Sequence, residues 1–188
     1  MTDRIFFPGN PWPAGHPIKE LEWTARVQDG TLWFDLHLVT EDYYAEHDYD
    51  EDESEEGADE DDNDDGDSWT SPGVWGNYHA CTLSSTYWHT GGFKVAEGDS
   101  LRLEDLDGLE ITVDDPPPED NDAHAFHVYL LGHDAAGHHK FLFTRVPGTR
   151  RFDIAWSGRL ALIYQGDDEF RYEFHTVLHG VEAPAEVR

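Results

Sequence analysis

The sequence predicts an all-β protein: an antiparallel β-sandwich or flattened barrel built from hairpins, with a long acidic loop inserted after the first hairpin. Three observations support this fold class. Apolar and polar residues alternate in several short segments, as they do in strands that bury one face. Turn-forming dipeptides separate these segments at short intervals. No window combines a helical period with helix caps.

The clearest element is a hairpin in the first quarter of the chain. Apolar and polar residues alternate strictly in residues 19–27 and again in residues 31–39. Asp29-Gly30 lies between them and suits a two-residue hairpin turn, where positive φ angles are needed. This turn sets the register, which pairs Val27 with Leu32, Ala25 with Phe34, Trp23 with Leu36 and Leu21 with Leu38.

Two further hairpins are expected in the last third of the chain. A turn at residues 134–137 would place His133 opposite His138. A second loop further on would place Leu160 opposite Phe174. Both predictions follow from matching the apolar positions of consecutive segments across a turn.

The rest of the chain is expected to add shorter strands. Three consecutive prolines within residues 114–122 indicate a stiff extended connector, a candidate for a crossing between sheets. The strand segments predicted after the acidic loop are residues 78–89, 101–103, 109–113, 125–132, 138–146, 152–156, 160–164 and 170–174.

Length, charge and cysteine content narrow the class of protein. At 188 residues we expect a single β domain over residues 1–188. The formal net charge of −29 predicts repulsion from nucleic acid and anionic membranes, and attraction to basic proteins and cations. The one cysteine, Cys81, excludes an intramolecular disulfide and a cysteine zinc cage. Without an apolar run of about 18 residues or a signal-like start, the expected location is the cytoplasm.

The acidic segment, residues 41–68, is the most unusual stretch. Residues 41–67 contain seventeen Asp and Glu and no Lys or Arg. A block of like charge has too little apolar surface to offset the entropy of ordering, which predicts a solvated, flexible insertion. The remaining residues still carry a net charge of −12, so the scaffold is acidic too.

Part of this segment resembles a calcium-binding loop in its spacing. Asp61, Asn63, Asp65 and Asp67 match positions 1, 3, 5 and 7 of an EF-hand. Position 12 needs a bidentate Glu and is Pro72, and no helices are expected to flank the loop. We therefore expect no cofactor, with weak binding of calcium or another divalent cation as an alternative.

Histidine and cysteine chemistry is less favoured. His133 and His138 could face one another, but a zinc site needs three or four converging ligands and no third is visible. Cys81 with His79 could form a nucleophile and base, whereas a buried apolar Cys81 is the favoured interpretation. No phosphate loop, nucleophile elbow or dinucleotide fingerprint occurs, so the sequence favours a non-enzymatic protein.

The sequence favours an acidic interaction protein that binds a basic protein partner electrostatically. Two classes fit: an immunity- or antitoxin-like inhibitor that covers the cationic groove of a nuclease, and a carrier for basic partners. The alternative is a small-ligand module that binds calcium or carbohydrate through the acidic loop and nearby aromatic residues, among them Trp33. Aromatic anchors are needed for retention because exposed ion pairs contribute only about 0–1 kcal/mol each. The predicted partner-binding residues are Asp48, Tyr49, Asp50, Glu51, Asp52, Glu53, Glu55, Glu56, Asp59, Glu60, Asp61, Asp62, Trp69 and Trp75.

Overall fold

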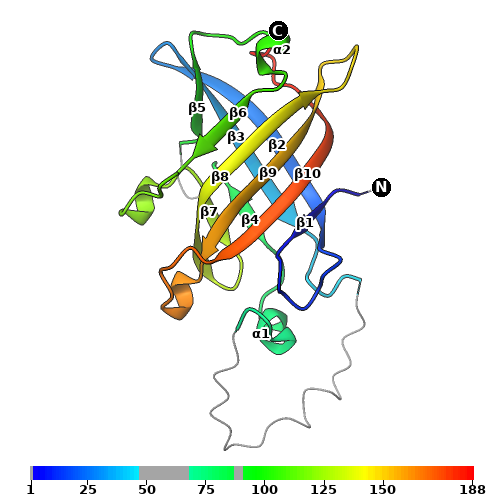
Figure 1. The fold of residues 1–188 in the computed structure, drawn as a ribbon, viewed down its shortest axis with the longest axis vertical. Coiled ribbons are helices and arrows are strands. Elements are labelled where there is room, and N and C mark those ends of the chain that lie inside the picture. The colour runs from blue at the N-terminus through cyan, green and yellow to red at the C-terminus, as the bar shows by residue number, and fades with distance from the viewer. Residues whose placement is uncertain (1, 47–67, 87–90) are drawn as a thin grey trace, which may run out of the picture.

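Eight antiparallel strands form a closed β-barrel, to which two short strands are added (Figure 1). The computed structural model describes residues 2–46, 68–86 and 91–188. The barrel strands are β1 (Arg4–Phe6), β2 (His16–Gln28), β3 (Thr31–Thr40), β4 (Thr82–Ser84), β7 (His127–Tyr129), β8 (His133–Arg145), β9 (Arg151–Ala161) and β10 (Tyr172–Glu182). The added elements are β5 (Phe93–Glu97), β6 (Glu110–Val113), the short helices α1 (Pro72–Gly76) and α2 (Leu103–Leu106), and single 3-10 turns at Asn121–Ala123 and Ile163–Gln165.

The prediction of an all-β antiparallel fold is confirmed, and the barrel form holds rather than the sandwich. Two three-residue strands close the circle: β1 pairs with both β2 and β10, and β4 pairs with both β3 and β7. Both strands are too short to show an alternation of apolar and polar residues in the sequence. Because the strands form one continuous sheet, the proline-rich connector does not cross between two sheets.

The register predicted for the first hairpin is confirmed. Strands β2 and β3 pair Trp23 with Leu36 and Gln28 with Thr31. At the tip, Asp29 and Gly30 have φ angles of 51° and 72°, as a type I′ turn requires.

The two hairpins predicted for the last third are wrong in register. Residues 134–137 lie inside β8, and His133 pairs with Tyr129 of β7 rather than facing His138. The turn comes earlier because the Asp134 carboxylate accepts the Leu131 N–H at 3.0 Å, which stabilises a tight turn before β8. In the last hairpin Leu160 pairs with Tyr172, because β9 ends at Ala161 and the connection to β10 begins earlier than predicted, with a 3-10 turn at Ile163–Gln165.

A β-bulge in β8 separates two consecutive histidines. Gly137 pairs with Arg159 and Lys140 pairs with Ser157, so β8 holds one residue more than β9 over this stretch. His138 adopts a positive φ of 51°. As a result His139 lies in the core with no exposed surface, while His138 lies on the outer wall.

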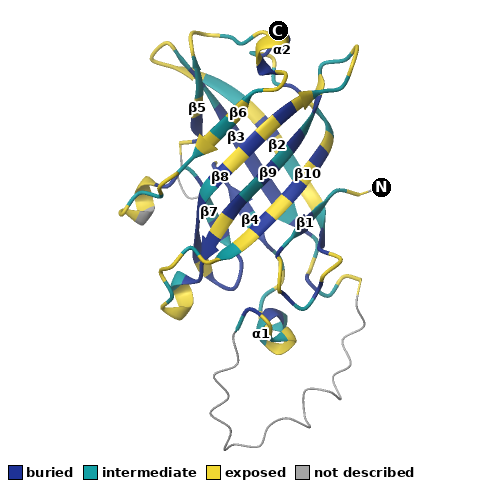
Figure 2. Cartoon of the chain, viewed as in Figure 1, coloured by how far each residue is buried: buried dark blue, intermediate teal, exposed yellow. Residues whose placement is uncertain are grey.

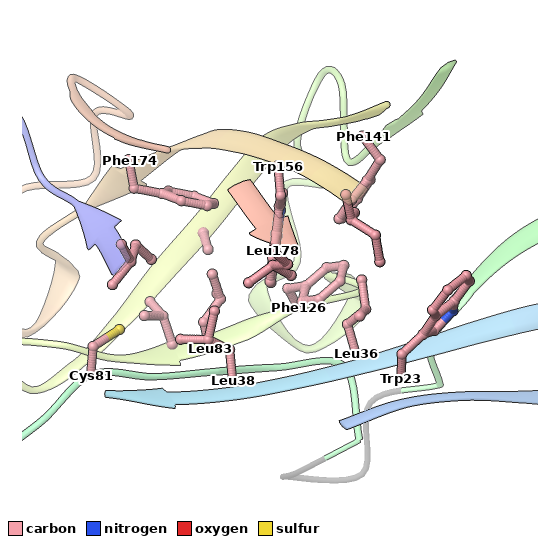
Figure 3. Packing of buried hydrophobic residues seen from close by; sticks show 14 of the residues in the cluster. Trp23, Leu36, Leu38, Cys81, Leu83, Phe126, Phe141, Trp156, Phe174 and Leu178 are labelled. Carbon is pink, nitrogen blue, oxygen red and sulfur yellow. The ribbon is translucent and has the colours of Figure 1, made fainter. Parts of the chain in front are cut away.

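Large apolar side chains from all sides of the barrel fill its interior. Buried and exposed residues alternate along the strands, most regularly in β9 and β10 (Figure 2). In Figure 3 Phe126, Trp156 and Phe174 project toward one another from different parts of the chain. An eight-stranded barrel is just wide enough for side chains to fill, and here the interior serves as the hydrophobic core.

Candidate functional site at the base of the acidic segment

The acidic segment leaves and rejoins the barrel at one end, where six buried aromatic rings pack together. We call these rings the base cluster. Their exposed fractions are 7% or less, and they come from the N-terminal lead-in, the start of β2, the residues just after β3, and α1 with the residues before it. The members are Phe7, Trp12, His16, Tyr43, Trp69 and Trp75. In Figure 1, α1 lies at this end of the barrel.

The N-terminal side of the segment is fixed by hydrogen bonds and one ion pair. The Tyr43 hydroxyl donates to the backbone oxygen of Leu130 at 3.0 Å, which ties the chain to the barrel wall. Glu46 lies three residues after Tyr43. Arg4 Nη1 donates to its Oε1 at 3.0 Å, and Arg4 Nη2 contacts the second carboxylate oxygen. This bidentate pair anchors Glu46, the last described residue before residues 47–67, to strand β1.

The C-terminal side is held by indole hydrogen bonds. Trp69 donates its indole N–H to the backbone oxygen of Pro8 at 2.9 Å. Trp75 donates its indole N–H to the backbone oxygen of Trp69, also at 2.9 Å. Pro72 lies in the first turn of α1, where its fixed φ suits a helix start and no N–H is lost.

The two sides meet directly. The Tyr44 hydroxyl donates to the backbone oxygen of Pro72, and the Tyr43 ring lies 4.9 Å from that of Trp75. The described chain on either side of residues 47–67 is therefore held together at the base cluster.

The structure gives Trp69 and Trp75 a different role from the predicted one. Both were expected to anchor a partner, yet they are 3% and 0% exposed and hold the base cluster together. Their aromatic surface is already covered, so in this structure neither ring presents a platform to a partner or a sugar. The other predicted partner-binding residues, Asp48 to Asp62, lie outside the described residues, as do the cation ligands Asp61, Asn63, Asp65 and Asp67.

The base cluster includes residues that the sequence did not single out. Trp12 and His16 lie in or next to an irregular, proline-rich stretch that gives no periodic signal. Asn10 Nδ2 donates to His16 Nε2 at 2.9 Å, and the Trp12 N–H donates to Asn10 Oδ1 at 3.1 Å. Arg4 is the only Lys or Arg among the first 18 residues. This isolation was the one feature of the sequence that could have indicated its ion pair with the acidic segment.

The barrel uses most of its own cations internally. Nine of the twelve Lys and Arg side chains form an ion pair with a carboxylate in the described part of the chain. Among the described residues of the acidic segment, Glu46 is the one whose carboxylate pairs with one of these nine side chains, that of Arg4. Within the described ranges, Lys19, Lys140 and Arg188 have no such partner.

Neither cysteine nor histidine forms a recognisable reactive centre in the described part of the chain. Cys81 is fully buried, and burial raises the pKa of its thiol, so it stays protonated. The predicted buried Cys81 is thus confirmed, while the His79 side chain is 92% exposed and hydrogen-bonds Asp42 instead. Among the residues that the structure describes, no three His, Cys, Asp or Glu side chains converge in the way a metal ion needs.

Comparison with known proteins adds no relative. No family model matches the chain, and no curated protein or solved structure matches it either. In the described ranges, no helix combines the length and the hydropathy that crossing a membrane requires.

Proposed function

We propose that the barrel presents residues 47–67 as a polyanionic binding segment for a strongly basic protein. Fourteen of these 21 residues are Asp or Glu. The activity is binding rather than catalysis, and the partner is recognised by its density of Lys and Arg. An inhibitor that covers a cationic groove and a carrier for basic proteins both fit this chemistry.

The pairing of the barrel's own cations carries this proposal. A polyanionic segment could be neutralised by its own domain, but nine of the twelve cations already contact carboxylates of the described part. Lys140, one of the three others, projects from the outer wall of β8. The fourteen carboxylates therefore have few intramolecular cations to pair with, and a basic partner supplies what is missing.

The position of the base cluster at one end of the barrel also supports the proposal. Tyr43, Tyr44, Trp69 and Trp75 hold both described flanks of the segment at one barrel end. A concentrated field raises the association rate of an oppositely charged protein by roughly 10- to 1,000-fold. Salt reduces this effect, since the Debye length is about 8 Å at physiological ionic strength.

The test replaces residues 48–67 with a short Gly-Ser linker, which removes all fourteen carboxylates at once. Association of the intact chain and of this variant with cytochrome c, a small basic protein used as the probe, is followed by stopped flow at low salt. We expect the replacement to slow association at least about tenfold and to flatten its salt dependence.

A second variant separates charge from length. It keeps the full length of the chain and changes each Asp to Asn and each Glu to Gln within 48–67. It should bind as poorly as the linker variant. Equal association rates for intact protein and both variants would refute the proposal, and one stoichiometric calcium site by calorimetry would favour the small-ligand alternative instead.

A further inference from the structure

Three side chains on neighbouring strands form a row across the outer wall of the barrel. Lys140 of β8 pairs with Ser157 of β9, and Ser157 pairs with His175 of β10. Directly opposed residues on one sheet face have Cβ atoms about 5 Å apart, so the row spans roughly 10 Å. We call these three residues the central row. Two clefts of different character meet along it.

The cleft on one side of the central row is polar. It encloses about 420 Å³ and is lined by a His–Asp hydrogen bond and an Arg–Glu ion pair besides the row. His138 Nδ1 lies 2.7 Å from Asp115 Oδ1, and Arg159 Nη2 lies 3.4 Å from Glu173 Oε1. We call it the polar cleft.

Once these pairs are made, the remaining groups of the polar cleft are mainly hydrogen-bond donors. Each carboxylate already faces a cation or an imidazole, whereas Lys140 is one of the three cations with no carboxylate partner in the described part. The Ser157 hydroxyl and the His175 imidazole line the same cleft. Ammonium, hydroxyl and guanidinium donors together are complementary to an oxyanion.

The β8 bulge produces this arrangement. The extra residue and the positive φ of His138 leave His138 and Lys140 on the outer wall, where the His138 imidazole hydrogen-bonds Asp115. The His138 N–H donates to the backbone oxygen of Asp114 at 2.8 Å, and Asp114 also has a positive φ of 50°. Bulges and non-glycine residues with positive φ concentrate at functional sites. Away from such sites their cost in folding free energy brings no functional gain.

The cleft on the other side of the central row is apolar. It encloses about 350 Å³ and shares Lys140, Ser157 and His175 with the polar cleft. Leu142, Ala155 and Val177 form its next row, in register on β8, β9 and β10. Leu142 and Val177 are 37% and 43% exposed, which places two of the large exposed hydrophobic side chains in one row. Glu110 lies beyond Leu142 at the β6 rim, away from Val177.

From these two clefts we infer a binding site for a small amphiphile with an anionic head and a short alkyl tail. The head, a phosphate-class oxyanion, lies at Lys140, Ser157 and His175 and extends toward Arg159. The tail lies over Ala155 and Val177. Both volumes are in the range of small-molecule sites.

The occupant is a soluble amphiphile rather than a membrane surface. A chain with a net charge of −29 is repelled by an anionic bilayer. The two clefts also form a short, bounded site, and Lys140 and Arg159 balance Asp115 and Glu173 within it, so the local charge does not repel one anion.

The test is a titration of the full-length protein with three probes, followed by backbone amide shifts in NMR. Hexyl phosphate carries head and tail, inorganic phosphate carries the head alone, and hexanol carries the tail alone. Hexyl phosphate should bind saturably and about tenfold more tightly than either fragment, with shifts centred on β8, β9 and β10. Binding to anionic vesicles without binding to hexyl phosphate would overturn the inference.

Two pairs of matched variants locate the site. Lys140→Gln should weaken hexyl phosphate binding about tenfold, because a charge-assisted hydrogen bond is lost. Lys19→Gln removes another lysine without a carboxylate partner in the described part, on β2, and should have no effect. Val177→Ser should weaken hexyl phosphate but not inorganic phosphate, while Val27→Ser, at a valine of similar exposure on β2, should change neither. Equal losses in a variant and its control, or no saturable binding by hexyl phosphate, would refute the site.

Discussion

Trp75 donates its indole N–H to the backbone oxygen of Trp69 across 2.9 Å, and both rings are buried in the base cluster. The hydrogen bond joins α1, which follows the acidic segment, to the barrel end. The stability of this platform and the charge of the segment are thus separate properties, which different substitutions should affect.

We expect Trp75→Ala to destabilise the fold by about 3–5 kcal/mol, because removing a fully buried Trp side chain leaves a cavity and removes its indole hydrogen bond to Trp69. Urea unfolding followed by tryptophan fluorescence and circular dichroism measures this cost. Val27→Ala, at a residue 45% exposed, is the control and should change stability by no more than about 0.5 kcal/mol. A loss near the control value would mean that the base cluster is not a structural unit.

Replacing residues 48–67 with the Gly-Ser linker should leave the free energy of unfolding unchanged or raise it by about 1 kcal/mol. Tyr44 and Trp75 hold the two flanks of residues 47–67 without any contribution from the replaced residues. Closing a short linker costs less chain entropy than closing the longer native segment. Removing like charge also reduces self-repulsion. Urea denaturation at two salt concentrations tests this. A loss of several kcal/mol would show that the segment contributes to the fold itself.

Stability should fall as the pH is lowered, in part through His139. Burial lowers the pKa of His139 to about 3, whereas an unfolded histidine has a pKa near 6.5. Between these values the unfolded chain binds a proton that the native state excludes. Stability therefore decreases as pH falls from about 6.5 toward 3, by up to about 1.4 kcal/mol per pH unit.

His139→Gln isolates this effect, since Gln retains an acceptor near the Trp156 indole, which lies 3.3 Å from His139 Nδ1. The stability difference between the intact protein and the variant should shift in favour of the variant below about pH 6.5. Burial raises the pKa of Asp114 and Asp134, which has the opposite pH dependence, but both proteins share that contribution. His79→Gln, the same substitution at an exposed side chain, is the control for the substitution itself.

Two glycines with positive φ should respond differently to alanine. Gly30, φ 72°, has open space where an added methyl group would lie, so Gly30→Ala should cost only the backbone strain of about 1–2 kcal/mol. Gly92, φ 68°, would place a Cβ onto Asp35 Oδ1 and 2.5 Å from the Phe34 carbonyl oxygen. Gly92→Ala should therefore cost clearly more than Gly30→Ala in urea unfolding. Equal costs would mean that the Gly92 backbone moves freely away from β3.

Local chemistry made the first hairpin predictable, while long-range pairing made the last ones fail. Asp29-Gly30 and strict alternation both fix the same register for β2 and β3, so no distant residue was needed. Near His133 the apolar pattern predicted a turn at residues 134–137, whereas the chain turns earlier, where the Leu131 N–H donates to the Asp134 carboxylate. The bulge at His138 changed which histidine faces the core, and no sequence period marks it.

The site followed the same division. The charge of residues 41–67 is a property of composition, so the sequence alone determined the acidic, helix-poor β character. Tertiary structure decided that Trp69 and Trp75 are buried, that the barrel closes, and that Lys140, Ser157 and His175 share one row. The physical reason is the distance along the chain over which each interaction acts. Turn geometry and side-chain alternation act over a few consecutive residues. Closure through β1 and β4, by contrast, depends on backbone pairing between residues far apart in the chain, such as Ile5 with Thr176.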